Sequence, residues 1–371
     1  METVSGYTIK AIFEDHWARF LRKHPTGIPD YVLEDVGKML DCGKAEKLGY
    51  HLWRCPDHPT EEVKVPNTCK VRFCNRCGVQ ATNDWQERAY RDFPEVPYFH
   101  ITFTISDILR PFFLHLGYER DILFTAARRT MLSWFKEQGV TPALVMVMHT
   151  YGRDMKFHPH IHMIVSAGGM SKKGAWKAVE FIPYRMLRER WKTKLLVAVK
   201  PKLANDSQIE AMFQKTWYVN VGIRLFGVKV TVGYIGRYTK KPVLAESRIV
   251  GYDGKQVTIV YEDYNTGSRV VWTMPVFLFI ANLIQHIPPR QFKMVRYAGM
   301  LASRVKKLYQ EKLKQLFRHL THAVQKLSWR MRKWKRAGKD PLACSRCGRE
   351  MTLVEAAQRG RDGLLTIRTF A

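Results

Sequence analysis

Apolar and polar positions along the chain follow two different periods. Helical spacing of apolar residues runs through residues 7–41 and is interrupted twice by proline, which does not continue a helix. Alternation of β-branched and aromatic residues predicts a strand over residues 98–105. Short apolar runs bounded by turn residues predict two more strands, at 143–149 and 157–166. Residues 106–138 are predicted to form a long helical region.

The same patterns extend to the rest of the chain. They predict further helices at 80–93, 184–198 and 207–216, two strands within 217–232, a short helical stretch at 234–241, a β-meander at 247–274, and helices from there to the end.

Composition narrows the class of protein. The chain has 371 residues, 46% of them hydrophobic, which is enough for two or three domains with substantial cores. Lys and Arg number 61 against 33 Asp and Glu, and the formal charge of +28 argues against an ordinary metabolic enzyme. Such a surplus favours a polyanionic partner, with nucleic acid first and an anionic membrane second.

Targeting signals are not apparent. The chain has no run of about 18 apolar residues that would predict a membrane span. Its N-terminus has no basic segment followed by an apolar stretch, so we expect no secretory signal. We therefore expect a cytoplasmic protein whose cysteines are reduced.

The positive charge is densest near the C-terminal end. Between Arg304 and Lys339 there are thirteen Lys or Arg residues and one acidic residue, Glu311. A charge run is often only a solvated helix face, but this ratio favours contact with a DNA backbone. Trp329 and Trp334 lie in the run and could either stack on unpaired bases or pack in the core.

Five of the seven cysteines lie in one short stretch, and two pairs in it have the spacing of metal-binding turns. Cys55 and His58 form a C-x2-H pair, and Cys74 and Cys77 form a C-x2-C pair. Two such turns make a tetrahedral site, and thiolates with one imidazole favour Zn²⁺. We expect this zinc to be structural, because the segment has a thin core without it.

The remaining cysteines leave alternatives open. Cys42 and Cys69, with His51, could complete a second zinc site, or Cys69 could simply be buried. Cys344 and Cys347 form a zinc knuckle that has no second half nearby in the sequence. This knuckle either binds zinc with a distant residue or is a remnant.

Three histidines predict a second kind of metal site. His160 and His162 are two apart on a predicted strand, so they project from one face. His149 ends the preceding strand and can lie beside them after a short turn. Three imidazoles around one ion leave positions open, as in a catalytic site. His158 is expected to support this site or to contact DNA, whereas His100 is given no role beyond that of a strand histidine.

Two tyrosines lie further along the sequence. Tyr234 and Tyr238 are four residues apart and would share one face of a helix, with Arg237, Lys240 and Lys241 among and after them. A phenol has a pKa near about 10, and the cations and the metal would favour its ionised, nucleophilic form. Most tyrosine pairs at this spacing are core packing, so the prediction depends on their combination with the histidines and the charge.

Four motifs in this order resemble those of a known group of enzymes. The segments TCKVRFCNRCG, HTYGRDMKFHPHIHMIVSAGG, YIGRYTKKPVLAESRI and LIQHIPPRQFKMVRYAGMLA extend over nearly the whole chain. The histidine strand and the tyrosine segment resemble the HUH endonuclease superfamily. The four motifs together resemble the two-tyrosine rolling-circle transposases of the insertion sequence 91 family. In one departure, His58 stands where many relatives would have a cysteine.

The resemblance implies an α+β fold in which a central antiparallel sheet is flanked by helices. It also implies three segments: a helical and zinc-binding DNA-binding domain at 1–95, a catalytic domain at 96–245, and a small meander with a basic helical region at 246–371. The positive charge of the first and last segments would then grip phosphate backbones.

The implied activity is that of a nickase and strand transferase acting on single-stranded DNA at transposon ends and target. His149, His160 and His162 would hold Mg²⁺ or Mn²⁺, with imidazole ligands favouring Mn²⁺. Tyr234 or Tyr238 would attack the DNA and form a 5′-phosphotyrosine, which conserves the phosphodiester energy, so no nucleotide cofactor is needed. Arg237, Lys240, Lys241 and His158 would contact the DNA.

The resemblance leaves other functions to be weighed. A plasmid relaxase or replication initiator would use the same chemistry, and a non-catalytic zinc-containing DNA-binding protein would use none. The sequence has no G-x-x-x-x-G-K-[ST] phosphate loop, so a host helicase or the replication machinery would unwind the DNA. A bacterial protein associated with the nucleoid is therefore expected, without membrane partners.

Overall fold

The computed structural model describes residues 6–115, 117–202, 206–215, 217–239, 242–263, 266–316, 328–360 and 362–370. The chain forms two compact units. The terminal unit comprises Ile9–Gly78 and Val324–Ala371, and the central unit comprises Met1–Thr8 and Val79–Ala323. This division differs from the three consecutive segments expected from the sequence, because the end of the chain returns to its beginning.

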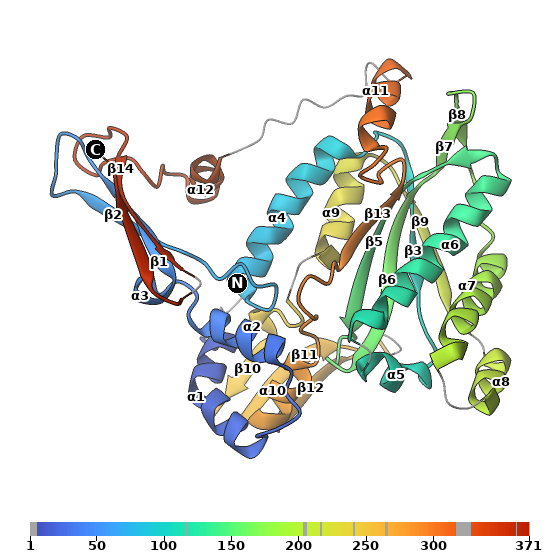
Figure 1. Cartoon of the computed structure of the whole chain (residues 1–371), viewed down its shortest axis with the longest axis horizontal. Coiled ribbons are helices and arrows are strands. Elements are labelled where there is room, and N and C mark those ends of the chain that lie inside the picture. Colours follow the sequence, from blue (N-terminus) through green and yellow to red (C-terminus); the bar gives the residue numbers. More distant parts are fainter. Residues whose placement is uncertain are drawn as a thin grey trace. The chain divides into compact units, whose positions relative to one another are not determined.

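The central unit is built on a five-stranded sheet with the order β13-β5-β6-β3-β9, in which all neighbours are antiparallel (Figure 1). Its strands are β3 (Tyr98–Phe103), β5 (Ala143–Tyr151), β6 (Phe157–Ser166), β9 (Val219–Leu225) and β13 (Val295–Gly299). The sheet confirms the predicted α+β class and the two predicted strands that carry the histidines.

Helices cover both faces of this sheet, with α6 and α7 on one side and α4 and α9 on the other (Figure 1). In β5, Leu144, Met146 and Met148 belong to the hydrophobic core on the side of α6 and α7. The alternate residues Ala143, Val145 and Val147 belong to the core on the side of α4 and α9. A strand buried on both faces reads as a continuous apolar run, as the sequence of β5 does. The helices are α4 (Asn75–Asp92), α5 (Leu109–His115), α6 (Asp121–Glu137), α7 (Tyr184–Val199), α8 (Asp206–Gln214), α9 (Val228–Thr239) and α11 (Lys306–Leu316).

Two smaller sheets complete the central unit. The predicted meander is present as β10 (Ile249–Tyr252), β11 (Gln256–Glu262) and β12 (Arg269–Pro275), and it is followed by α10 (Val276–Ile284). A second three-stranded sheet contains β4 (Val140–Thr141), β7 (Gly168–Ser171) and β8 (Trp176–Ala178). The 3-10 turns are η1 (Gly117–Arg120), η2 (Lys200–Lys202) and η3 (Glu246–Arg248).

The terminal unit combines segments from both ends of the chain. Its four-stranded sheet has the order β15-β14-β1-β2, so the red strand β14 lies beside the blue strand β1 in Figure 1. The strands are β1 (Gly49–Arg54), β2 (Glu62–Pro66), β14 (Thr352–Arg359) and β15 (Leu365–Thr369). The helices are α1 (Ile9–Lys23), α2 (Asp30–Leu40), α3 (Ala45–Leu48) and α12 (Trp329–Ala337), of which α1 and α2 match the prediction for residues 7–41.

Two predictions of secondary structure were wrong, and a third was coarser than the structure. The helical region expected over 106–138 is present as three pieces, α5, η1 and α6. The second strand expected within 217–232 is the first half of α9, in which Val228, Val232 and Ile235 recur at helical spacing and pack against the sheet. The C-terminal part contains β13, β14 and β15 besides its helices. In each strand, pairing with a distant partner decided the conformation over local preference.

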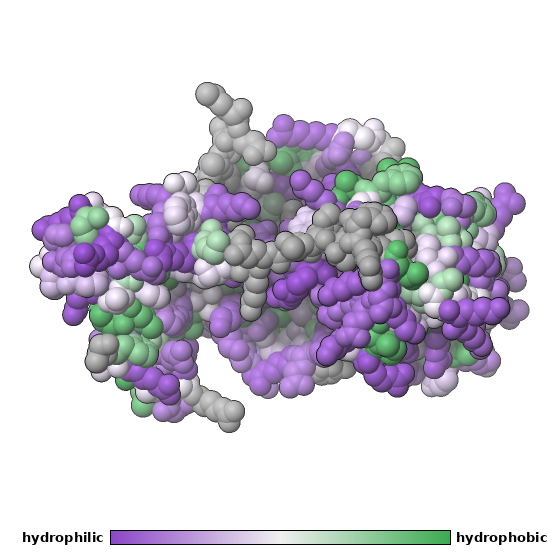
Figure 2. Space-filling view, turned by 90° about the horizontal axis from the view of Figure 1, so that it is seen from above, coloured by the Kyte–Doolittle hydropathy of each residue, from purple (hydrophilic) through white to green (hydrophobic). Residues whose placement is uncertain are grey.

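Hydrophilic residues predominate on the face of the molecule shown in Figure 2, where the hydrophobic patches are small and separate. Among the described residues, no helix is long and apolar enough to cross a membrane. Trp329 and Trp334 are 37% and 51% exposed, so neither is a core residue.

Candidate functional site

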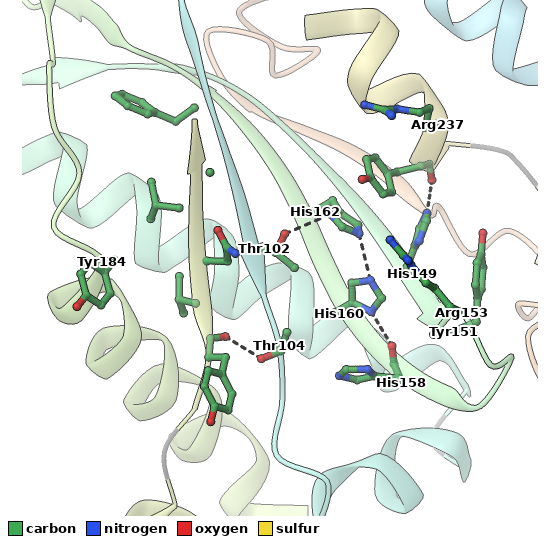
Figure 3. Close-up of a pocket in the computed structure, with 18 of the residues that line it drawn as sticks. Thr102, Thr104, His149, Tyr151, Arg153, His158, His160, His162, Tyr184 and Arg237 are labelled. Carbon is green, nitrogen blue, oxygen red and sulfur yellow. Dashed lines mark hydrogen bonds between the residues drawn. The ribbon is translucent and has the colours of Figure 1, made fainter. Parts of the chain in front are cut away.

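A cavity of about 1060 Å³ opens in the central unit over the sheet (Figure 3). His149, His160 and His162 lie on one wall of it, with Tyr238 and Arg237 from α9. Phe181, Tyr184 and Tyr218 line another part of the cavity. Imidazoles, phenols and exposed aromatic rings therefore share a single space large enough for a segment of a polymer.

The hairpin of β5 and β6 brings the three predicted histidines together. His149 is paired directly with His160, and His162 follows two residues later on the same face of β6. One nitrogen of each histidine lies within 4.8 Å of one nitrogen of each of the others. The Nε2 atoms of His160 and His162 are 3.1 Å apart, as in Figure 3. A cation between these nitrogens would be bound by imidazoles with room for other ligands.

Backbone carbonyls orient two of these rings. Nδ1 of His160 donates to the carbonyl of His158 over 2.7 Å, so the lone pair of His160 is on Nε2. Nε2 of His149 donates to the carbonyl of Tyr238 over 2.6 Å, so its lone pair is on Nδ1. His158 thus contacts the cluster through its backbone carbonyl.

Burial keeps His160 and His162 in the neutral form that binds metals. It lowers the pKa of His162 well below its ordinary value, and the neighbouring histidines act in the same direction. The pKa of His160 is also lowered, chiefly by burial and partly against the effect of its bond to His158. Neutral imidazole is the ligand form, so neither ring has to lose a proton to a cation at neutral pH. The donor set therefore fits a divalent cation.

His100, on β3, belongs to the site although sequence reasoning gave it no role. Its Nε2 lies 3.0 Å from Nδ1 of His162, and its Nδ1 lies 3.1 Å from the hydroxyl oxygen of Tyr234. Burial lowers the pKa of His100 to about 4, with Arg237 and His160 adding to the effect. The alternation of β3 showed that His100 and Thr102 share a face, but only the pairing of Thr102 with His162 places that face at the site.

Helix α9 presents the two tyrosines to the histidines. The ring of Tyr238 stacks on that of His162 with centroids 4.0 Å apart, and the two tyrosine rings are 5.6 Å apart. Gly236 allows α9 to approach α4, because a Cβ at this position would lie 2.2 Å from Nε2 of Gln86. The shared helical face expected for the tyrosines is therefore present in the structure.

The sequence led us to expect that nearby cations favour the ionised form of the tyrosines, but the surroundings of Tyr234 favour the neutral form. Its pKa is raised to about 12, chiefly by burial and also by the hydrogen bond and charge of Tyr238, and Arg237 offsets this only in part. The Arg237 guanidinium lies 4.6 Å from the centre of the Tyr234 ring. In the protein without DNA or metal, the effect of desolvation on the pKa of Tyr234 is thus larger than the opposite effect of Arg237. Lys240 and Lys241, also expected to contact DNA, lie outside the described residues.

The cysteines of the terminal unit form two clusters, and the pairing expected from the sequence was wrong. Cys74 and Cys77 lie with Cys42 and Cys69, whereas Cys55 and His58 lie with Cys344 and Cys347. In the first cluster, Sγ of Cys77 is 3.7 Å from Sγ of Cys42 and 3.5 Å from that of Cys69. Four thiolates at such distances suit a tetrahedral zinc ion. Turns that are close in sequence thus belong to different sites, because β2 separates them.

Comparison with known proteins gives the site its context. Residues 12–105 match the family model described as “Transposase zinc-binding domain”, and residues 143–309 match the one described as “Putative transposase”. The transposase for insertion sequence element IS801 from Pseudomonas savastanoi pv. phaseolicola is 32% identical over 360 residues, covering 92% of this chain and 87% of the relative. A Sinorhizobium fredii (strain NBRC 101917 / NGR234) protein described as “Putative transposase y4qJ” is 27% identical, covering 69% of this chain and 71% of the relative. No solved structure matches the chain.

The zinc-binding segment, the mixed α/β unit with its histidine cluster and these matches define a transposase. The sequence identity to the IS801 transposase, which extends over nearly the full length of both proteins, identifies the family of this transposase. The chain belongs to the insertion sequence 91 family of transposases, and it carries that family's zinc-binding domain.

Proposed function

We propose that this transposase nicks and rejoins single-stranded DNA at transposon ends through a 5′-phosphotyrosine intermediate, by the rolling-circle route. The observation that carries the proposal is the position of Tyr238, whose ring lies 4.0 Å from that of His162 in a cluster of three histidines. A nucleophile beside a metal-binding cluster is the arrangement that phosphoryl transfer without a nucleotide cofactor requires.

His149, His160 and His162 would hold Mg²⁺ or Mn²⁺, and the imidazole donors favour Mn²⁺. When bound, such an ion would polarise the scissile phosphate and offset the negative charge that develops during transfer. The protein contributes the orientation of the ligands, since the carbonyls of His158 and Tyr238 hold His160 and His149 in the required tautomers.

Tyr234 and Tyr238 are the proposed nucleophiles. The phenolic oxygen bonds to phosphorus while its proton is lost to water, and the bond from phosphorus to the 3′ oxygen breaks. The 3′ oxygen takes up a proton and leaves as a free hydroxyl, so the 5′ side of the break remains on the enzyme. Attack by a 3′ hydroxyl on the phosphotyrosine reverses these changes and joins the strands. A second tyrosine permits a second transfer while the first link persists.

Exposed aromatic side chains favour an unpaired strand as the substrate. Phe181 and Tyr218, both on the cavity wall, are 69% and 71% exposed. Exposure of aromatic rings to water is unfavourable, and such rings can stack on unpaired bases. The bases of a duplex are already stacked on one another and offer no free face. Arg237, at the same cavity, would contact a phosphate, and the proposed contacts of His158, Lys240 and Lys241 would add to it.

The wider setting follows from this chemistry. A host helicase or the replication machinery would supply the unpaired strand, since the chain has no phosphate-loop motif of its own. The basic helices α11 and α12 would bind phosphate groups over a larger area. The enzyme would then work where its DNA is, at the bacterial nucleoid.

Single-stranded oligonucleotides covering both strands of each element end test the proposal. With Mn²⁺ present, we expect one strand to give a covalent adduct that retains a 3′ label, while a 5′ label is released on a fragment ending in 3′ hydroxyl. The double variant Tyr234→Phe/Tyr238→Phe should give no adduct, and Tyr252→Phe is the matched control. An adduct that retains the 5′ label, or one that maps to Tyr252, Tyr261 or a serine, would refute the proposed chemistry.

A further inference from the structure

The C-terminal segment completes the zinc-binding unit of the protein. Strand β14 pairs with β1 along its whole length, from Gly49 opposite Gln358 to Arg54 opposite Thr352. The approach is close, because a Cβ on Gly49 would lie 2.0 Å from the carbonyl oxygen of Ala357. The matched zinc-binding segment, residues 12–105, therefore contains only part of the sheet to which it belongs.

The second cysteine cluster lies at the end of this sheet and takes two donors from each segment. Sγ of Cys55 is 3.7 Å from Sγ of Cys347, and Nδ1 of His58 is 3.8 Å from the sulfurs of both Cys55 and Cys344. Zn–S bonds of about 2.3 Å and a Zn–N bond of about 2.0 Å in a tetrahedron place two sulfurs about 3.8 Å apart and sulfur about 3.5 Å from nitrogen. A disulfide would need about 2.05 Å, so these are free thiols around a point.

Each pair of donors lies on a turn that the backbone has already formed. In the C-terminal turn, the amide of Gly348 donates to the carbonyl of Cys344 over 2.9 Å, and the φ of +70° at Gly348 suits glycine. In the N-terminal turn, the amide of Cys55 donates to the carbonyl of Glu61 over 3.1 Å, which closes the loop that holds both Cys55 and His58. The spacing of two residues within each pair lets both side chains of a turn reach the same point.

Polar contacts join the two turns. Arg349 forms an ion pair with Asp57 over 2.7 Å, and Ser345 donates to the carboxylate of Glu61 over 2.5 Å. The apolar cluster beneath the turns is small and consists of Cys55, Cys344 and Met351, with Trp53 and Val63 packed against them. The β1–β14 ladder joins the two segments, but exposed ion pairs stabilise little and an apolar cluster this small does not by itself bring four donor atoms to one point. The convergence of four donors therefore calls for a metal ion.

We infer that Cys55, His58, Cys344 and Cys347 bind a second structural zinc ion, which fastens the C-terminal segment to the N-terminal zinc-binding domain. The inference does not depend on the proposed nuclease activity, since all four donors lie in the terminal unit. Each chain then carries two zinc ions, one bound by four thiolates and one by three thiolates and an imidazole. The C-terminal knuckle is thus a functional half-site whose other half lies far along the chain, since His58 and Cys344 are 286 residues apart.

Metal analysis of the purified full chain tests this inference. We expect two zinc ions per chain in the wild type, and one in the double variant Cys344→Ser/Cys347→Ser. The matched double variant Cys74→Ser/Cys77→Ser removes donors from the first cluster and should retain the second ion. One zinc ion in the wild type, or two in Cys344→Ser/Cys347→Ser, would overturn the inference.

Cobalt substitution separates ligation from a general loss of folding. The visible absorption of Co²⁺ depends on the number of thiolate ligands, so the wild type should show a sum of four-thiolate and three-thiolate spectra. His58→Cys should still bind two ions, and its spectrum should change to that of two four-thiolate sites. An unchanged spectrum in His58→Cys would show that His58 is not a ligand and would overturn the assignment.

Discussion

The hydroxyl oxygen of Tyr234 lies 3.1 Å from Nδ1 of His100, and the other nitrogen of His100 lies 3.0 Å from Nδ1 of His162. The three side chains thus form a hydrogen-bonded series that links a proposed nucleophile to a proposed metal ligand. If Nε2 of His162 offers its lone pair to a cation, its proton is on Nδ1 and is donated to Nε2 of His100. The proton of His100 is then on Nδ1, from which it can be donated to the oxygen of Tyr234. This direction favours the ionised phenol.

Substitutions of His100 test its two contacts separately. Glutamine places an amide near the position of Nε2, and asparagine places one near that of Nδ1. We expect His100→Gln to keep the affinity for Mn²⁺, and His100→Asn and His100→Ala to lower it about 10- to 100-fold. In a Tyr238→Phe background, His100→Gln should still slow the formation of an adduct on Tyr234. Equal effects of Gln and Asn on both measurements would contradict separate roles.

Loss of a metal ligand should separate cleavage from binding. We expect His160→Ala or His162→Ala to abolish detectable cleavage, and His149→Ala to be similarly harmful, while affinity for single-stranded DNA changes little. The reason is that the histidines would bind the ion, whereas the aromatic and basic side chains would bind the DNA. Cleavage assays and fluorescence anisotropy on the same oligonucleotide measure the two effects. His24→Ala, at an exposed position, is the control, and full cleavage by His160→Ala would reject the assignment.

The tyrosines should differ in their dependence on pH. The pKa of Tyr234 is raised to about 12, chiefly by burial. At pH values below this pKa, the ionised fraction of Tyr234 therefore increases about tenfold for each unit by which the pH rises. In Tyr238→Phe, we therefore expect the adduct on Tyr234 to form faster as the pH rises from about 7 to about 9. We also expect Tyr238 to act first in the wild type, since Tyr234 is costly to ionise. A flat profile in Tyr238→Phe would show that loss of the Tyr234 proton does not limit the rate.

The aromatic wall of the cavity should matter for unpaired DNA alone. Each stacked base contributes about 1–3 kcal/mol, so Phe181→Ala and Tyr218→Ala should each weaken binding of a single strand about 5- to 160-fold. Duplex binding should stay within about twofold. Phe226→Ala is a matched control, because Phe226 is 66% exposed, close to the 69% of Phe181, and does not line the cavity. Equal losses in Phe181→Ala and Phe226→Ala would argue against stacking at this wall.

Removal of zinc should destabilise the terminal unit. The binding energy of a structural zinc ion is folding energy, so a strong chelator should lower the midpoint of thermal unfolding by about 5 °C or more. Cys74→Ser/Cys77→Ser should reproduce part of this effect, with loss of metal measured on the same sample. An unchanged midpoint in metal-free protein would contradict a structural role for zinc.

Local spacing in the sequence was sufficient for several features of the site. Residues two apart on a strand share a face, so His160 and His162 could be placed together, and a short turn allowed His149 to join them. Residues four apart on a helix share a face, which placed Tyr234 with Tyr238. The paired cysteines showed that zinc was to be expected, although not which pairs share an ion.

Other features depend on contacts between segments that are distant in the sequence. His100 gains its role only through the pairing of β3 with β6, which puts Thr102 opposite His162. The division of the cysteines depends on the pairing of β1 with β14, which carries Cys344 and Cys347 to Cys55 and His58. Spacing along the chain determines which side chains share a face, because backbone geometry repeats locally. Which faces meet is decided by strand order and register, because these depend on the burial of apolar surface over the whole fold.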